Sequence, residues 1–326
     1  MGGITTQAAI LARHEASLQG RLRLVRLRSR ALGLAKTLYA YEPPGYAGEA
    51  GLPLLYLFRG HEREWANVRE DASRQATAVE DLDARIVAGT SPPLIALLPG
   101  LTSSDNHVPG LGIEMVAPAL NPKPGLGSGR FWSYLTDEVI PWAETRYRPS
   151  QRLAAGFSLG GYTVSLVAFG KPGYLDHAGF YDALFPWPEH DDPRRPDHEP
   201  LSDRVWTAAP ILSPAFGWPR DPAALARWNT TDWLLAADGA PLDALRRTRY
   251  WVQCAGLDGA RGNRDRAFEV CKLLAERGCR LGFGDVMLSA TAEHSWRWCD
   301  LFLGRFLDGV FAHEEAPVAS VATGAS

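Results

Sequence analysis

The chain has 326 residues, of which 46% are hydrophobic, and its formal net charge is −3 at pH 7. This length and composition suit one large α/β domain or two smaller domains and exclude a wholly disordered chain. Acidic and basic residues are mixed along the sequence, which argues against a nucleic-acid partner, because such a partner needs clustered basic residues.

The N-terminal third predicts a helix, a hairpin and the start of a parallel sheet. Residues 21–28 alternate arginine with apolar residues, which is typical of an edge strand with one solvated face. Two nearly continuous apolar runs predict strands that are buried on both faces, and a segment of helical composition lies between them, so we expect a parallel pair joined by a crossover helix. The expected ranges are helix 8–18, strands 22–27 and 37–41, strand 52–58, helix 64–86 and strand 92–100.

The rest of the chain continues the alternation of strands and helices. We expect helices over 131–147, 263–277 and 295–311, and strands over 152–155, 178–184, 250–255 and 281–288. The segment 185–247 interrupts this order and is rich in Pro, Trp, Asp and Arg, which predicts an insertion that partly covers the carboxyl edge of the sheet. The prediction is one doubly wound, mostly parallel α/β domain over 1–312 with a lid-like insertion at about 185–247, followed by a mobile tail over 313–326.

The most informative motif is Gly156-Phe157-Ser158-Leu159-Gly160-Gly161, between a short apolar strand and an apolar helix. A serine on so sharp a strand-to-helix turn holds a strained backbone, and Gly156 and Gly160 remove side chains that would clash across the turn. The starting helix directs unpaired backbone N–H groups, including that of Leu159, at an oxyanion near Ser158. Ser158 is therefore the predicted nucleophile.

A serine hydroxyl needs a base within reach, and the base needs an orienting group. His294 is the predicted base, because it follows a predicted strand at the same edge of the sheet as Ser158. His177 lies at the opposite end, and His190 and His198 lie in an acidic, proline-broken loop that we interpret as solvated rather than as a metal site.

The orienting acid is expected after the preceding strand, which selects Asp258. Asp265 competes with it, although an acid in the first turn of a helix is also explained by the helix dipole. Asp285, in the middle of a predicted strand, is a third candidate.

With these motifs in order, the chain resembles the putative-esterase family of α/β-hydrolases, the esterase D-like group that includes S-formylglutathione hydrolases, feruloyl esterases, enterochelin esterases and mycolyltransferases. The residues that carry the resemblance are 43–46, 52–60 with Trp65, 156–161, 256–263 and 294–296 with Trp298. The resemblance implies an oxyanion hole of two backbone N–H groups, that of Leu159 and one from the loop 59–61, which we assign to His61.

The chain departs from the family pattern at two places. Arg59 stands where the family often has histidine, and it is either a structural residue paired with an acid or a contact for an anionic part of the substrate. Ala292-Glu293 precedes His294 where the family commonly has a glycine two residues before the histidine.

These features predict a serine esterase that cleaves a small-molecule carboxylic ester or thioester through an acyl-serine intermediate, without a cofactor or a metal. One alternative is an acyltransferase that uses the same residues with an acceptor other than water. A second is a non-catalytic binding protein that retains the fold.

The location of the protein is predicted from the N-terminal segment and the cysteines. No secretory signal and no membrane-spanning run is visible. Cys254, Cys271, Cys279 and Cys299 have no metal-ligand spacing, and we expect buried thiols rather than a disulfide framework. The protein is therefore expected to be cytoplasmic, with no membrane partner.

Overall fold

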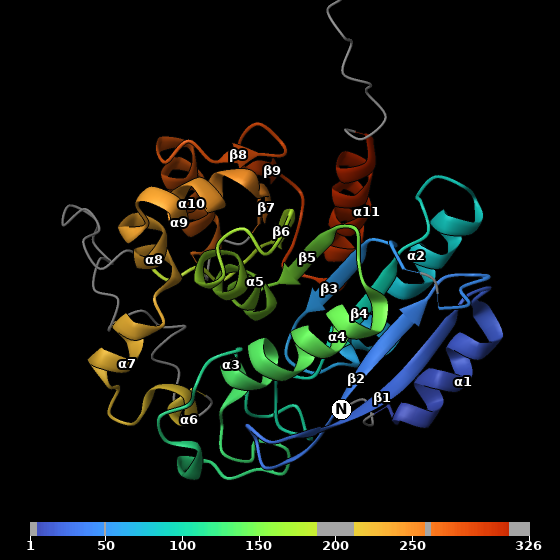
Figure 1. Ribbon diagram of the computed structural model, residues 1–326, viewed down its shortest axis with the longest axis horizontal. Coiled ribbons are helices and arrows are strands. Elements are labelled where there is room, and N and C mark those ends of the chain that lie inside the picture. Colours follow the sequence, from blue (N-terminus) through green and yellow to red (C-terminus); the bar gives the residue numbers. More distant parts are fainter. Residues whose placement is uncertain (1–4, 49, 188–211, 258–261, 313–326) are drawn as a thin grey trace, which may run out of the picture.

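The computed structural model describes residues 5–48, 50–187, 212–257 and 262–312, and every structural statement below refers to these residues. Their nine strands form one sheet, in the order β1-β2-β4-β3-β5-β6-β7-β8, with β9 paired to β7 beyond the end of β8 (Figure 1). The strands are β1 Arg21–Ser29, β2 Leu34–Glu42, β3 Leu54–Phe58, β4 Ile95–Pro99, β5 Arg152–Phe157, β6 His177–Tyr181, β7 Arg249–Ala255, β8 Arg280–Leu281 and β9 Met287–Ser289.

The sheet is antiparallel at one edge and parallel elsewhere. Strands β1 and β2 form the expected edge hairpin, with Arg21 opposite Glu42, and β2 runs antiparallel to β4. From β4 through β3, β5, β6 and β7 every pair is parallel. The crossover between β3 and β4 confirms the strand–helix–strand unit predicted from the two apolar runs. The carboxyl ends of β5, β6 and β7 consequently lie at the same edge of the sheet.

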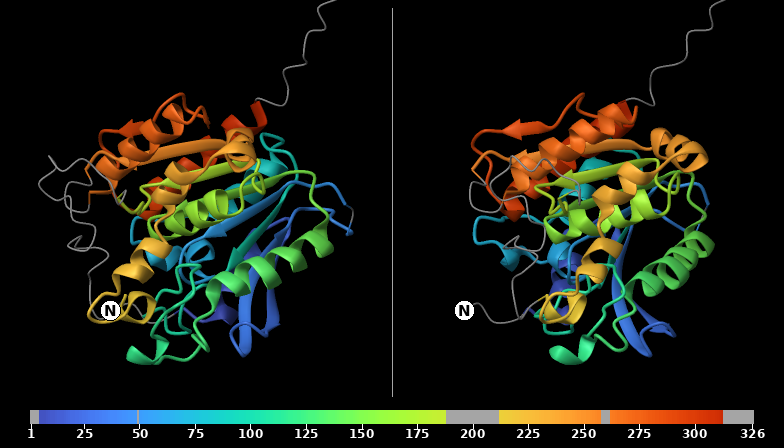
Figure 2. Two further views of the ribbon diagram at one scale, coloured as in Figure 1. Left: turned by 60° about the vertical axis from the view of Figure 1, so that its left-hand side comes forward. Right: turned by 90° about the vertical axis from the view of Figure 1, so that its left-hand side faces the viewer.

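Helices cover both faces of this sheet (Figures 1 and 2). One apolar cluster packs α1, α2 and α11 against one face, and a second packs the 131–147 helix, α5 and α10 against the other. This confirms the doubly wound architecture. The helices are α1 Gln7–Ser17, η1 Glu64–Ala66, η2 Val68–Glu70, α2 Ala78–Val87, η3 Pro118–Leu120, α3 Phe131–Ser133, the π-helical η4 Tyr134–Val139, α4 Ile140–Tyr147, α5 Leu159–Gly170, α6 Ser213–Phe216, α7 Pro222–Arg227, α8 Thr230–Ala236, α9 Gly239–Arg247, α10 Asn263–Glu276 and α11 Trp296–Ala312.

One predicted helix and one predicted strand are each divided into shorter elements in the structure. The helix expected over 64–86 is two short 3₁₀ turns followed by α2, because Thr77 and Glu80 form a capping box that starts a new helix at Ala78. The strand expected over 281–288 is split into β8 and β9 by a turn at Gly282, whose N–H donates to Tyr250 O at 2.7 Å.

The described part of the insertion, 212–247, consists of the helices α6 to α9. Two of its four described aromatic side chains, Phe216 and Trp228, are buried. Trp228 lies 6.0 Å from Trp132 between ring centroids, and its carbonyl accepts a hydrogen bond from the Tyr162 hydroxyl at 2.7 Å. Trp218, by contrast, is 58% exposed. The segment 188–211, with His190, His198 and Trp206, lies outside the described residues, as do the tail 313–326 and Asp258.

Two predictions about the whole chain can be compared with the described residues. All four cysteines are buried as free thiols, which confirms the prediction. None of the described helices combines the length and apolar character that crossing a membrane requires.

Candidate active site

Ser158 stands on a strained turn at the carboxyl end of β5. Its backbone has φ 54° and ψ −117°, a left-handed conformation that a side chain disfavours. The turn is held by hydrogen bonds on both sides: the Ser158 N–H donates to Tyr181 O at 3.1 Å, and the Ser158 carbonyl accepts the Leu184 N–H at 3.1 Å. Strain of this kind, fixed by the surrounding sheet, is characteristic of a nucleophile turn.

The two glycines of the motif are required by close backbone approach. A Cβ on Gly156 would lie 2.3 Å from the Gly160 carbonyl oxygen, and a Cβ on Gly160 would lie 1.9 Å from the Phe58 carbonyl oxygen. The start of α5 therefore packs directly against the end of β3. This contact brings the loop after β3 beside Ser158.

His294 lies in the loop between β9 and α11, and three contacts hold that loop in place, two with the sheet and one with the segment after η2. The Tyr181 hydroxyl donates to Glu293 O at 2.6 Å, and Asp71 Oδ2 accepts the Trp296 N–H at 2.9 Å. The His294 ring lies 4.6 Å from the ring of Phe157, between centroids. Since Phe157 immediately precedes Ser158, the structure brings the predicted base and the predicted nucleophile to the same place on the sheet edge.

The carboxylate bonded to His294 is that of Asp182, a residue that the sequence analysis did not consider. Its Oδ2 pairs with His294 Nδ1 in a short contact, and its side chain is fully buried. Further hydrogen bonds orient Asp182: its Oδ1 accepts the Ala255 N–H at 3.2 Å, its N–H donates to Gln253 O at 2.8 Å, and its carbonyl accepts Asn263 Nδ2 at 3.0 Å. Asp182 is thus a fixed acceptor for one ring nitrogen of His294.

Asp182 was missed because the apolar run 178–184 predicts a strand that continues through it. In the structure β6 ends at Tyr181, and Asp182 adopts a left-handed backbone with φ 41° at the carboxyl end of the strand. One signal was present in the sequence: a single acid within an apolar run is costly to bury unless it has a partner.

The three carboxylates that the sequence analysis did consider have different positions. Asp258 lies outside the described residues and stays a prediction. Asp265 is in the first turn of α10, where its carboxylate lies 3.5 Å from Arg264 Nε. Asp285 accepts the N–H of the adjacent Val286 at 2.6 Å, in the turn between β8 and β9. His177 starts β6 at the opposite edge, as predicted, and its Nδ1 accepts the Trp251 Nε1–H at 3.1 Å.

The two predicted oxyanion donors, the N–H groups of Leu159 and His61, differ in whether they already donate a hydrogen bond. The Leu159 N–H, at the first position of α5, has no acceptor within the described part of the chain. The His61 N–H donates to Glu64 Oε2 at 2.6 Å, and the Gly60 N–H donates to the same oxygen at 2.9 Å. The His61 N–H could reach an oxyanion only after it leaves Glu64, so its role stays a prediction.

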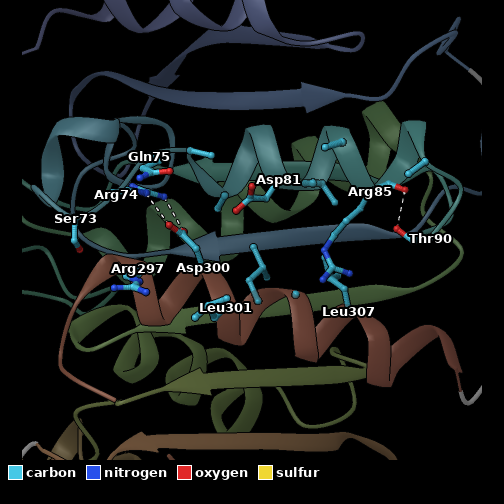
Figure 3. A pocket seen from close by; sticks show the side chains of 17 residues that line it. Ser73, Arg74, Gln75, Asp81, Arg85, Thr90, Arg297, Asp300, Leu301 and Leu307 are labelled. Carbon is cyan, nitrogen blue, oxygen red and sulfur yellow. Dashed lines mark hydrogen bonds and ion pairs between the residues drawn. The ribbon is translucent and has the colours of Figure 1, made fainter. Parts of the chain in front are cut away.

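A buried ion pair joins the segment between η2 and α2, which contains Arg74, to the start of α11, which contains Asp300. Arg74 donates through Nε and Nη2 to Asp300 at 2.8 and 2.9 Å, and through Nη1 to the carbonyls of Glu64 and Asn67 at 2.8 and 3.1 Å. Its guanidinium also lies 4.7 Å from the ring centroid of Trp296. Figure 3 shows this pair at one end of a groove of about 730 Å³ between α2 and α11, which contains none of the predicted catalytic residues.

Replacing Arg74 by methionine is expected to lower the free energy of unfolding by about 3–5 kcal/mol, because Asp300 would remain as an unpaired buried acid. Urea denaturation measures this. Arg85→Met is the matched control, since Arg85 of α2 pairs with Asp308 of the same helix α11, but with side chains that are 30% and 57% exposed. Its expected cost is about 0–1 kcal/mol, and equal losses in the two variants would contradict the assignment.

The same variant has a pH signature. Burial raises the pKa of Asp300 from 3.8 to about 7, although Arg74 acts in the opposite direction. A carboxyl with a higher pKa in the native state binds protons preferentially there, so stability falls as pH rises from about 4 through 7. Removing Arg74 raises the pKa of Asp300 further. The loss in free energy of unfolding of Arg74→Met relative to the wild type should therefore be smaller at pH 5 than at pH 8.

A mostly parallel doubly wound sheet, with a serine on a strained turn after β5 and a histidine loop before the last helix, defines an α/β-hydrolase. The family model described as "Putative esterase" matches residues 29–246. The chain belongs to this family of serine esterases, as its sequence motifs predicted.

Solved structures with the same fold include several esterases. A ferulic acid esterase aligns with 90% of this chain and 98% of its own, at a TM-score of 0.65 and 17% identity. An S-formylglutathione hydrolase from Agrobacterium tumefaciens aligns with 91% of this chain and 95% of its own, at a TM-score of 0.60 and 17% identity. A fluorophosphonate-binding serine hydrolase from Staphylococcus aureus aligns with 88% of this chain and 97% of its own, at a TM-score of 0.56 and 13% identity. No curated protein matches the chain in sequence.

Proposed function

We propose that this chain hydrolyses carboxylic esters or thioesters of small molecules through an acyl intermediate on Ser158. The observation that carries the proposal is the contact of His294 Nδ1 with the buried carboxylate of Asp182, while the same imidazole packs on Phe157 beside the serine turn. A serine, an imidazole and a carboxylate in this order are the groups that acyl transfer at neutral pH requires.

The proposed reaction has two halves. In the first, Ser158 Oγ attacks the carbonyl carbon and its proton passes to His294; since Nδ1 is engaged by Asp182, the proton transfer falls to Nε2. The tetrahedral intermediate then expels the alcohol or thiol, which takes the proton from His294. In the second half, His294 removes a proton from water, the hydroxide attacks the acyl-serine, and the carboxylic acid leaves with Ser158 protonated again.

Asp182 acts in this scheme by fixing the ring and the tautomer of His294 and by stabilising the imidazolium. Asp258 is the competing carboxylate. The oxyanion is held by the Leu159 N–H, together with an N–H of the loop 59–61; for His61 this requires that its N–H exchange Glu64 for the oxyanion. Loss of one such donor typically costs about 10²–10³ in rate.

The test combines turnover with labelling. The protein is expected to hydrolyse p-nitrophenyl acetate or butyrate and to react with a fluorophosphonate probe at Ser158, mapped by peptide mass spectrometry. Product analysis in the presence of alcohol, thiol and amine acceptors separates hydrolysis from acyl transfer. Absence of both turnover and labelling in the folded protein would indicate a binding protein rather than an enzyme.

A further inference from the structure

Arg59 lies at the edge of the candidate active site. It follows β3 directly, and the pairing of Phe58 with Gly156 puts it level with Phe157, one residue before Ser158. Its Cα would lie 2.9 Å from a Cβ on Gly160, so the backbone at Arg59 packs against the first turn of α5. Arg59 is therefore fixed beside the nucleophile turn by the sheet itself.

The guanidinium of Arg59 lies on the ring that also supports the base. Its Cζ is 4.9 Å from the centroid of Phe157, and the His294 ring is 4.6 Å from that same centroid. Stacking on an aromatic face restricts the plane of a guanidinium and leaves its N–H groups directed outward. The cation and the imidazole thus share one rigid support.

The hydrogen-bond donors of Arg59 are unused within the described part of the chain. The nearest acid is Glu64, whose Oε1 is 3.6 Å from Arg59 Nε, too far for a hydrogen bond. Glu64 instead uses Oε2 to accept the N–H groups of Gly60 and His61. The Arg59 side chain is 19% exposed, and its Nε is buried without a partner, whereas Nη1 and Nη2 are not among the buried unpartnered atoms. They consequently reach the surface.

Two other arginines of this protein that join separate segments are fully hydrogen-bonded to an acid. Arg74 makes two bonds to Asp300 and further bonds to backbone carbonyls, and Arg152 donates through two nitrogens to Glu144 at 2.8 and 2.7 Å. Arg59 has the charge of Glu64 at 3.6 Å but no hydrogen bond from it, so an acceptor from outside the chain has a role to fill at the Arg59 N–H groups.

We infer that Arg59 binds a carboxylate of the substrate and that this chain prefers esters with an anionic group near the ester bond, on the acyl or the alcohol part. This inference rests on the proposed function. A planar guanidinium with free N–H groups matches a carboxylate in a two-point hydrogen-bonded pair. Glu64 leaves the Arg59 N–H groups open, because its Oε1 is 3.6 Å from Arg59 Nε and its Oε2 accepts the N–H groups of Gly60 and His61.

Two pairs of esters test the inference and locate the anion. Monomethyl glutarate and dimethyl glutarate differ in a carboxylate on the acyl part, and 4-acetoxybenzoate and its methyl ester differ in a carboxylate on the alcohol part. In at least one pair, Arg59→Gln should lower kcat/KM for the anionic ester about 10- to 100-fold, mainly by raising KM, and change that for the neutral ester less than about threefold. Arg59→Lys should keep part of the preference, since it keeps the charge.

Arg63→Gln is the matched control. Arg63 belongs to the same loop, its Nε is also buried without a partner, and it lies 3.6 Å from a glutamate, Glu70, but it does not lie on Phe157. Arg63→Gln should leave the ratio of kcat/KM for the anionic ester to kcat/KM for the neutral ester unchanged in both pairs. Equal losses for neutral and anionic esters in Arg59→Gln, or wild-type ratios near one in both pairs, would overturn the inference while leaving the proposed hydrolysis intact. Failure of hydrolysis itself would show in the neutral esters and in the fluorophosphonate label.

Discussion

Ser158→Ala is expected to lower kcat for p-nitrophenyl butyrate by a factor on the order of 10⁴–10⁶, the range in which removal of a serine nucleophile falls in serine hydrolases. Any residual rate would come from the oxyanion donors and from substrate binding. The substitution removes one hydroxyl from a turn whose φ of 54° is held by backbone hydrogen bonds, so the fold should persist. Circular dichroism and the thermal midpoint check this, and the fluorophosphonate label should disappear.

Ser165→Ala is the control for this experiment. Ser165 lies on the same helix, α5, and its hydroxyl is buried with bonds to Tyr162 O and Thr230 Oγ1, both at 2.8 Å. Its removal should cost about 1 kcal/mol of stability and leave kcat within about threefold. Unchanged turnover in Ser158→Ala would refute the nucleophile assignment.

The sheet was largely predictable because its strands are short and strongly apolar. The runs around 54–58, 95–99 and 152–157 have no exposed face in the fold, which is the pattern of parallel strands covered on both sides. The positions of Ser158 and His294 at the carboxyl edge followed from the same reasoning, because a strand followed by a helix fixes where that edge lies. These predictions depend on local pattern alone.

The remaining features depend on contacts between distant residues. The division of the predicted helix 64–86 is set by the cap at Thr77, while Arg74 ties the preceding loop to Asp300, 226 positions away. The donor role of His61 depends on whether its N–H stays on Glu64, which no motif indicates. The carboxylate of His294 depends on where β6 ends, and a run such as 178–184 does not mark the point at which the backbone turns left-handed.

Asp182→Asn is expected to lower kcat by about 10³–10⁴-fold, because the amide would favour the wrong tautomer of His294. The neighbours of Asp182 decide the orientation of that amide. The Ala255 N–H donates to Oδ1 at 3.2 Å, and this bond is shorter than the one that Asn263 Nδ2 donates to Oδ2, at 3.5 Å. The new carbonyl oxygen therefore keeps the position of Oδ1, and the new NH₂ faces His294 Nδ1, which must then accept a hydrogen bond. The proton moves to Nε2, where the ring can no longer act as a base toward Ser158.

Asp258→Asn is the paired variant, and the comparison separates the two candidate carboxylates. With Asp182 as the orienting acid, Asp258→Asn keeps kcat within about threefold, and Asp182→Asn loses activity at an unchanged thermal midpoint, because the substitution is nearly isosteric. The reverse result, a large loss for Asp258→Asn alone, would assign the role to Asp258 and leave Asp182 as a structural partner of His294. Kinetics with p-nitrophenyl butyrate over pH 5–9 decide between them, since a ring locked in the wrong tautomer loses rate across the whole range instead of shifting its profile.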